Sequence, residues 1–210
     1  MDKEYWKSYY EKHGQPFQPS PFCLFALDNY LEKGDSIIDL GCGNGRDSVK
    51  MAEEGLRVVG VDQCCTVIDS LNAKQIPDAT FIGCGFESMP SHLKIKHAYS
   101  RFSLHSIPEH VEDVLLAWVS THLEDGYFLI ETRTDKDDLA GKETDHYRRF
   151  LSAENLVCKM IRCGFEIAYM EHARGFSRYD STFGVDYNSD DPYLLRVVSK
   201  LKTKAGRGGF

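Results

Sequence analysis

The segment from Ile37 to Val49, IIDLGCGNGRDSV, constrains the fold of this chain more than any other. Within it a short β-branched run passes directly into glycines at positions 41, 43 and 45. Glycine lets the backbone adopt left-handed conformations and lets a ligand approach without interference from a Cβ atom. A helix is expected next, over residues 46–54. The segment therefore predicts a strand, a tight ligand-binding turn and a helix, the usual start of a nucleoside-binding α/β fold.

Strand-like and helix-like segments alternate along the rest of the chain. The strands are expected at 36–40, 57–61, 80–82, 95–99, 126–131, 165–171 and 193–201. The helices are expected at 20–34 and 46–54, then up to residue 74, and at 108–122 and 152–164. This alternation predicts an α/β fold with a doubly wound, mostly parallel sheet of seven strands. The first strands are apolar on both faces, as expected for strands covered by helices on each side.

The length of 210 residues suits one domain, expected over 1–203, with 204–210 as a disordered tail. Residues 1–33 are expected to form an N-terminal helical cap. Its first helix carries Tyr5, Trp6 and Tyr9, and Ser20 caps its second. Two roles remain open for this cap: a lid over a bound ligand, or a helix that packs on the sheet edge.

Composition excludes several classes of protein. Lys and Arg number 25 against 32 Asp and Glu, a net charge of −7, which disfavours binding to nucleic acid or to an anionic membrane surface. The seven cysteines contain no C-x-x-C pair and no spacing typical of a zinc site, so we expect reduced, buried thiols and no metal. With no apolar N-terminal run and no segment of about 18 apolar residues, a cytoplasmic protein is expected.

An acidic residue follows the glycine turn at the distance that a ribose-binding site requires. Asp62 ends the second expected strand, about 20 residues after the glycines, where a carboxylate can accept both hydrogen bonds of a ribose diol. A dinucleotide fingerprint would need a third glycine where this chain has Arg46. A nicotinamide-dependent oxidoreductase is therefore the weaker alternative, and a turn without a ligand is weaker still.

The pattern Asp39-x-Gly-x-Gly-x-Gly followed by Asp62 resembles motif I and the second acidic residue of the class I S-adenosylmethionine-dependent methyltransferases. The resemblance covers about Tyr5 to Lys200. It implies S-adenosylmethionine as cofactor and a Rossmann-like sheet whose last strand is antiparallel and lies beside the sixth. It also implies the following cofactor-binding residues: Asp39, Gly41, Cys42, Gly43, Arg46, Asp47, Asp62, Gln63, Phe86 and Ser100.

The resemblance assigns these residues to parts of the cofactor. The three residues from Gly41 to Gly43 would line the methionine part, with Arg46 and Asp47 near its tail. Asp62 would hold the ribose, with Gln63 beside the adenine. Arg46 has an equal alternative as an ordinary charge on the helix surface.

One position departs from the family pattern. The family often has an acidic residue after the third strand, which accepts a hydrogen bond from the adenine amino group, but this chain has Gly85 there. Phe86 is still expected to cover the adenine ring. Glu87 or a backbone carbonyl would then accept from the amino group, or nothing does.

Three further segments resemble a subfamily of small bacterial methyltransferases. They are YSRFSLH at 99–105, ETR at 131–133 and DHYRRF at 145–150. The Asp/Asn-Pro-Pro-aromatic motif of nucleic-acid amino-methylating enzymes is missing after the fourth strand. The resemblance therefore implies a small-molecule acceptor, anionic or containing sugar or phosphorus, rather than a nucleic acid.

Candidate acceptor-site residues come from these segments and from the charged, non-periodic stretch 132–149, which is expected to be a long loop. His105 and His146 are candidate bases, because imidazole titrates near neutral pH, and Tyr147 is a weaker one. The candidate anion-binding arginines are Arg101, Arg133, Arg148 and Arg149. Each of these side chains has a structural alternative. A cofactor-binding module without catalysis also remains open, and the protein is expected to be a monomer or homodimer.

Overall fold

The computed structural model describes residues 3–12, 18–143, 146–177 and 191–202. The helices are α1 Lys3–Lys12, α2 Pro21–Asn29, α3 Arg46–Glu53, α4 Cys65–Ala73, α5 Glu109–His122 and α6 Ala153–Arg162, with short 3-10 turns η1 Phe86–Ser88 and η2 Leu104–Ser106. The strands are β1 Ser36–Leu40, β2 Arg57–Asp62, β3 Ala79–Gly83, β4 His97–Arg101, β5 Phe128–Arg133, β6 Phe165–Ala173 and β7 Leu194–Leu201. The tail predicted at 204–210 lies outside the described residues.

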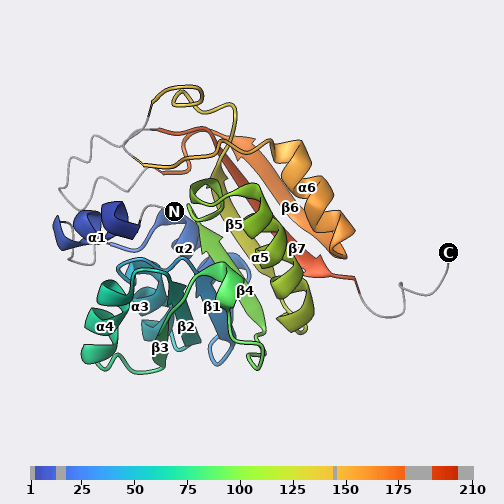
Figure 1. Ribbon diagram of the computed structural model, residues 1–210. Helices are drawn as coiled ribbons and strands as arrows, with labels where there is room; N and C mark the ends of the chain where they lie inside the picture. Colours follow the sequence, from blue (N-terminus) through green and yellow to red (C-terminus); the bar gives the residue numbers. More distant parts are fainter. Residues whose placement is uncertain (1–2, 13–17, 144–145, 178–190, 203–210) are drawn as a thin grey trace.

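The strands form one seven-stranded sheet in the order β3-β2-β1-β4-β5-β7-β6 (Figure 1). Neighbouring strands from β3 to β5 pair in parallel. β7 is antiparallel to both β5 and β6. This confirms the predicted mostly parallel sheet, including the antiparallel last strand inserted beside the sixth.

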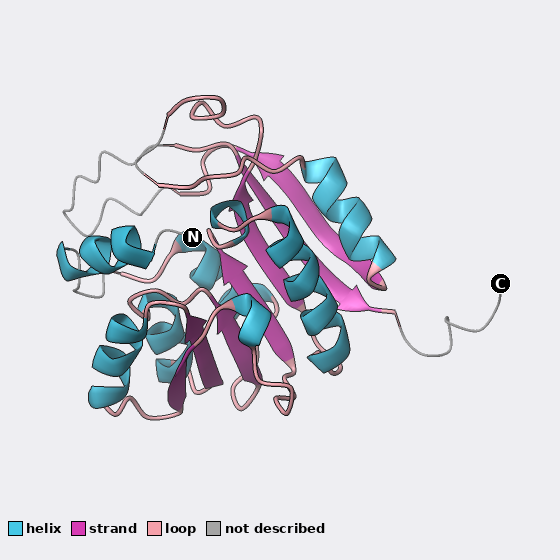
Figure 2. Cartoon of the chain, in the orientation of Figure 1, coloured by secondary structure: helices cyan, strands magenta, loops and turns pink. Residues whose placement is uncertain are grey.

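Helices cover both faces of the sheet (Figure 2). On one face, Ile37 of β1 packs with Phe22 of α2 and Met51 of α3. On the other, Ile38 packs into a cluster that includes Leu115 of α5 and Leu156 of α6. Consecutive residues of β1 therefore enter opposite layers of the core, as the apolar first strands predicted.

Pairing between distant segments shifts several predicted boundaries. The fourth strand begins at His97 rather than at Ile95, because the Lys96 N–H donates to the Ser36 hydroxyl and Ile95 instead bridges Leu123. The fifth strand continues to Arg133, which lies opposite Leu194 of β7. The predicted loop at 132–149 therefore loses its first two residues to β5.

Of the other local predictions, some are confirmed and some are wrong. Ser20 and Ser152 cap α2 and α6 as predicted, each accepting a backbone N–H three residues on. All seven cysteines are free thiols, but only three of them, Cys23, Cys42 and Cys64, are buried as predicted. Cys84 and Cys163 are partly exposed, and Cys65 and Cys158 are exposed. None of the helices in the described ranges is both long enough and apolar enough to cross a membrane.

Candidate active site

A cavity of about 400 Å³ opens at the carboxyl ends of β1, β2 and β4. The predicted site residues that line it are Asp39, Gly41, Cys42, Gly43, Arg46, Asp47, Asp62, Gln63, Phe86, Arg101, His105, Arg133, His146 and Arg148. Three other predicted site residues do not line the cavity: Ser100, Tyr147 and Arg149. The structure therefore gathers residues from both predicted halves of the site around one cavity.

The N-terminal helix forms part of the cavity wall. Tyr5, Trp6, Tyr9 and Tyr10 of α1 all line the cavity. Figure 1 shows α1 on the side of the sheet to which the arrow of β4 points. The helix also contacts α4, so a lid and a packed helix both stay open as roles for the cap.

The glycine turn is packed so tightly that side chains do not fit. Gly41 has φ +83°, and a Cβ atom there would lie 2.3 Å from the Ser103 Oγ. Gly43 has φ +53°, and its Cβ would lie 2.4 Å from the Tyr10 hydroxyl. The left-handed backbone and these short distances favour a glycine at each position.

Asp62 holds this turn together through its carboxylate. Its Oδ2 accepts the Gly43 N–H at 3.1 Å, and its Oδ1 accepts the Cys64 N–H at 2.8 Å. Burial raises the pKa of Asp62 above the usual value, although the backbone hydrogen bonds oppose the rise. The carboxylate is therefore fixed at the end of β2, beside the glycine turn.

Asp39 is a buried acid below the glycine turn. Its Oδ2 accepts a hydrogen bond from the Ser48 hydroxyl at 2.6 Å. Burial raises the pKa of Asp39 to about 7, and the nearby carboxylates of Asp47 and Asp62 add to the rise. An ionised Asp39 is costly in this environment unless a cation lies near it.

Asp47 has a structural role that the sequence did not indicate. Its carboxylate accepts the Ser20 N–H and the Ser20 hydroxyl, each at 2.7 Å, and the Tyr99 hydroxyl at 2.8 Å. Burial would raise the pKa of Asp47, but Arg46, Arg101 and the Ser20 hydrogen bonds hold it below the usual value. The residue predicted near the methionine tail thus anchors the start of α2 to α3 and β4.

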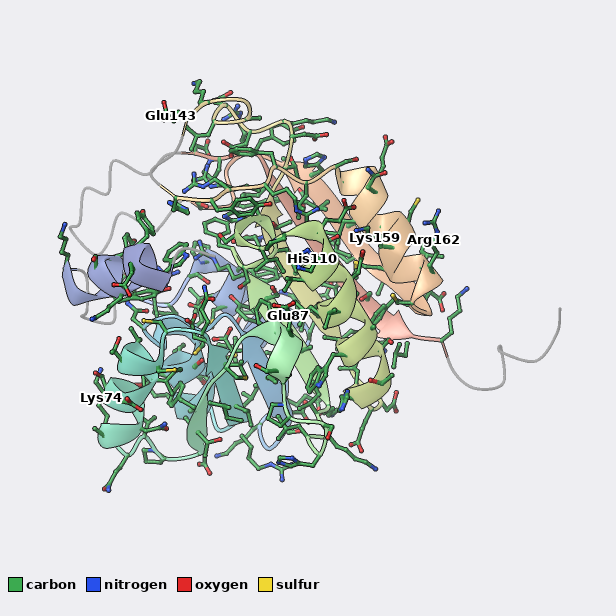
Figure 3. The ribbon with its side chains drawn as sticks, viewed as in Figure 1. Lys74, Glu87, His110, Glu143, Lys159 and Arg162 are labelled. Carbon is green, nitrogen blue, oxygen red and sulfur yellow. The ribbon has the colours of Figure 1, made fainter. Side chains whose placement is uncertain are left out.

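At the expected adenine end of the site, the structure shows where Glu87 points. Phe86 is buried and lines the cavity together with Cys84 and Gly85. Glu87 does not line it: its side chain is 60% exposed and lies 3.8 Å from His110 of α5 (Figure 3). Glu87 is thus turned away from the position at which the sequence considered it as a substitute for the missing acid.

The arginines at the other end of the cavity are held by carboxylates that lie behind them. Arg101 donates from Nε to Glu131 at 2.9 Å, and Arg133 donates from Nη1 to Asp137 at 2.9 Å. Neither Glu131 nor Asp137 is among the cavity-lining residues. Both arginines therefore line the cavity, whereas these two carboxylates do not.

Phe102 lies between these two arginines. The Arg101 guanidinium carbon lies 4.1 Å from the centre of its ring, and that of Arg133 lies 5.7 Å away. Phe102 has φ +59°, a backbone conformation that is strained for a bulky residue. Non-glycine residues in this region are uncommon away from functional sites, and no local sequence signal marks the position.

His105 is a poor general base, contrary to the expectation from its sequence position. Its ring is 3% exposed, and burial, together with the charges of Arg133 and Arg148, lowers its pKa well below the usual value. Its Nδ1 accepts the Arg133 N–H at 3.4 Å and lies 3.3 Å from the Thr132 hydroxyl. A ring whose pKa is lowered by burial and by neighbouring cations is a weak base.

His146 connects the acceptor loop to α1. Its ring stacks on Tyr5 at 4.4 Å and meets Trp6 edge-on at 4.9 Å. Arg148 donates to its Nε2 at 3.2 Å. The imidazole nitrogen that a base would use is thus already an acceptor for the neighbouring arginine.

Arg149 and Tyr147 do not line the cavity, although the sequence predicted both in the acceptor site. Arg149 donates from its backbone to the His105 carbonyl at 2.6 Å and from Nη2 to Glu112 of α5 at 2.5 Å. Arg149 therefore fastens the loop to η2 instead of facing an acceptor. The Tyr147 side chain is 43% exposed. Ser100 is fully buried within β4 and does not reach the cavity.

The family comparison decides which class of protein has this site. The family described as Methyltransferase domain matches residues 12–187. The chain belongs to this family. It carries a methyltransferase domain of the S-adenosylmethionine-dependent class, as predicted. The nicotinamide alternative is set aside.

Solved methyltransferase structures share the fold at low sequence identity. A TehB-like SAM-dependent methyltransferase from Corynebacterium glutamicum is 18% identical with a TM-score of 0.64, covering 93% of this chain and 94% of that chain. A SAM-dependent methyltransferase from Methanosarcina mazei is 18% identical with a TM-score of 0.66, covering 83% and 96%. The glycopeptide N-methyltransferase MtfA in complex with SAM is 15% identical with a TM-score of 0.66, covering 89% and 96%.

One curated relative is much longer than this chain. Ribosomal protein L11 methyltransferase from Staphylococcus epidermidis is 24% identical over 164 residues, which is 73% of this chain. The chain spans 45% of the length of that protein. In the described ranges, no group of three or more His, Cys, Asp or Glu side chains is placed to hold a metal ion.

Proposed function

We propose that this methyltransferase transfers the methyl group of S-adenosylmethionine to a small anionic acceptor, such as a carboxylate or a phosphate monoester. The observation that carries the proposal is the charge distribution around the cavity. The cavity is lined by the acids Asp39, Asp47 and Asp62 and by four arginines: Arg46, Arg101, Arg133 and Arg148. The charges of Arg101, Arg133 and Arg148 all act on His105, so these three lie together. A cationic wall of this kind favours an anion.

The residues of the site fit the cofactor. Gly41 and Gly43 line the cavity without side chains of their own, which agrees with a ligand lying close to the backbone. The bound cofactor supplies an electrophilic methyl group on a sulfonium whose departure leaves a neutral thioether. Binding and orienting the acceptor in line with that methyl group is then the main task of the protein.

The geometry of the two histidines supports an acceptor that needs no deprotonation. Burial and the charges of Arg133 and Arg148 lower the pKa of His105 well below its usual value, which makes it a weak base, and the Nε2 of His146 accepts from Arg148. An anionic oxygen carries its nucleophilic electron pair without loss of a proton. The arginines would hold the anion, and α1 would exclude water from the reacting atoms.

The position of α1 supports a small acceptor over a protein. Tyr5, Trp6, Tyr9 and Tyr10 of α1 line the cavity, and this wall restricts access for a macromolecule. A second candidate acceptor, a protein, is favoured by the name of the curated relative from Staphylococcus epidermidis. Methyl transfer to a protein with no response to small anions would favour that second function.

Asp62→Ala is expected to weaken binding of S-adenosylhomocysteine by about 10- to 100-fold, because it removes hydrogen bonds to a charged acceptor worth about 1.5–3 kcal/mol. It also frees the Gly43 N–H that orders the turn. Calorimetry at pH 7.5 measures the change, with Asp69→Ala on the exposed side of α4 as the control. Equal affinities for wild type and Asp62→Ala would remove Asp62 from the cofactor site.

The anionic-acceptor proposal is tested with binding probes on protein saturated with S-adenosylhomocysteine. Benzoate and phenyl phosphate are expected to raise the melting temperature, and benzyl alcohol is not. Arg148→Gln is expected to weaken the anion response about tenfold in concentration, since one charge-assisted hydrogen bond is lost. Arg162→Gln removes the same charge from an exposed position of α6 (Figure 3) that does not line the cavity, and it should leave the response unchanged. An equal response to benzyl alcohol would contradict the proposal.

A further inference from the structure

The helix α1 contacts both predicted halves of the cavity through different residues. Tyr5 and Trp6 line the cavity beside His146, and Tyr10, one turn further along, lines it beside Gly43. The Tyr10 hydroxyl lies so near the glycine turn that a Cβ atom on Gly43 would be 2.4 Å from it. A single short helix therefore contacts both the glycine turn and the loop that carries His146.

His146 is the contact between α1 and an arginine of the cavity wall. Its ring stacks on Tyr5 with 4.4 Å between the ring centres and meets the ring of Trp6 edge-on at 4.9 Å. Its Nε2 accepts a hydrogen bond from the Nη2 of Arg148 at 3.2 Å. Stacked and edge-on ring pairs are favourable. The position of α1 and the position of the Arg148 guanidinium therefore depend on each other.

The length of α1 makes its position depend on its neighbours. The helix spans ten residues, Lys3–Lys12, whereas isolated helices shorter than about 12–15 residues are only marginally stable in water. Its order therefore depends on the surfaces against which it packs, which are the glycine turn, α4 and the ring of His146. A ligand that stabilises one of these contacts also favours the packed helix, and with it the other contacts.

We propose that His146 is a positioning residue that couples the two ligand sites through α1, so that the cofactor and an anionic acceptor strengthen each other's binding. Tyr10 would contact a cofactor on the glycine turn, which fixes one part of α1. The packed helix then holds the ring of His146, and His146 holds the guanidinium of Arg148. His146 thus acts on acceptor binding through Arg148 rather than as a base. This inference rests on the proposed anionic acceptor of the same cavity.

Calorimetry measures the coupling with phenyl phosphate as the anionic probe and S-adenosylhomocysteine as the cofactor probe. Wild type saturated with S-adenosylhomocysteine is expected to bind phenyl phosphate about tenfold more tightly than the free protein does, a factor typical of coupled sites. The same factor is expected for S-adenosylhomocysteine when phenyl phosphate is saturating, because coupling between two binding sites is reciprocal.

Two variants break the contact from its two sides. His146→Ala removes the ring from the loop, and Tyr5→Ala removes its stacking partner from α1; each is expected to reduce the factor to about twofold. His110→Ala is the matched control, since His110 is an exposed histidine of α5 (Figure 3) that does not line the cavity, and it should keep the tenfold factor. A general loss of affinity would weaken binding with and without S-adenosylhomocysteine equally, so the ratio reports coupling.

A factor that stays near tenfold in both His146→Ala and Tyr5→Ala would overturn the proposal, because the two ligands would then be coupled without α1. Equal affinity of wild type for phenyl phosphate with and without S-adenosylhomocysteine would also overturn it, and would leave the anionic acceptor in place. No binding of phenyl phosphate under either condition would contradict the proposed function itself, and this inference with it. Melting curves of the free variants show that the ratios are measured on folded protein. Because Tyr5 is only partly buried, its variant keeps the test decisive if His146→Ala does not fold.

Discussion

Glu131→Ala is expected to lower the free energy of unfolding by about 3–5 kcal/mol, because it leaves two buried guanidinium groups without their shared counterion. The Glu131 carboxylate is 1% exposed and accepts from the Nε of Arg101 at 2.9 Å and of Arg196 at 2.7 Å. The side chains of these two arginines are 11% and 8% exposed. Neither can lose its charge by deprotonation.

The three residues lie in one row across the sheet. Glu131 is opposite Arg101 of β4 on one side and opposite Arg196 of β7 on the other. Arg196 is further enclosed by the rings of Phe22, Phe25 and Phe176, at 5.4, 5.0 and 4.2 Å. Because Glu131 fixes Arg101 through Nε, its loss is also expected to disorder the cationic end of the cavity.

Denaturant unfolding at pH 7 measures this loss, which corresponds to a fall in melting temperature of roughly 6–20 °C for a chain of this size. Glu131→Gln keeps the shape and removes the charge, and should lose less. Glu87→Ala removes an exposed acid and is expected to change stability by less than about 0.5 kcal/mol. A loss below about 1 kcal/mol for Glu131→Ala would show that the row of charges is not coupled to folding.

The cofactor half of this site was predictable because its signals are local in sequence. Glycines followed by a helix, and an acid at the next strand end, specify the turn and Asp62 without knowledge of the rest of the fold. The contacts of Asp47 were not predictable in this way. Its partners Ser20 and Tyr99 are 27 and 52 residues distant, and only the assembled core brings them together.

The acceptor half was predicted less well for the same physical reason. The residue types of DHYRRF indicated an anion site, but the Arg149 guanidinium donates to Glu112, 37 residues away in the sequence. His105 was assigned as a base from its ordinary pKa, which burial next to Arg133 lowers. Charge and burial decide these roles, and both depend on contacts between distant segments.

Asp39→Asn is expected to stabilise the protein without cofactor at pH 8 by up to about 4 kcal/mol. The pKa of Asp39 is about 7 in the folded protein, compared with about 3.9 in an unfolded chain. Between these values the folded state binds a proton that the unfolded state has released, so wild-type stability falls as pH rises from about 4 to 7. Asparagine carries no charge and avoids this loss while it can still accept from the Ser48 hydroxyl.

Unfolding of both proteins between pH 4 and 8 tests the expectation. The stability difference should be small at pH 4, grow up to about pH 7 and stay constant above it, whereas Asp28→Asn, at an exposed carboxylate of α2, should run parallel to wild type. A difference that does not vary with pH would contradict the raised pKa. Because an ionised Asp39 is stabilised by a nearby cation, the same substitution should weaken S-adenosylmethionine binding at pH 8 by about tenfold. The acid that costs the free protein stability is then the one that favours the positively charged cofactor.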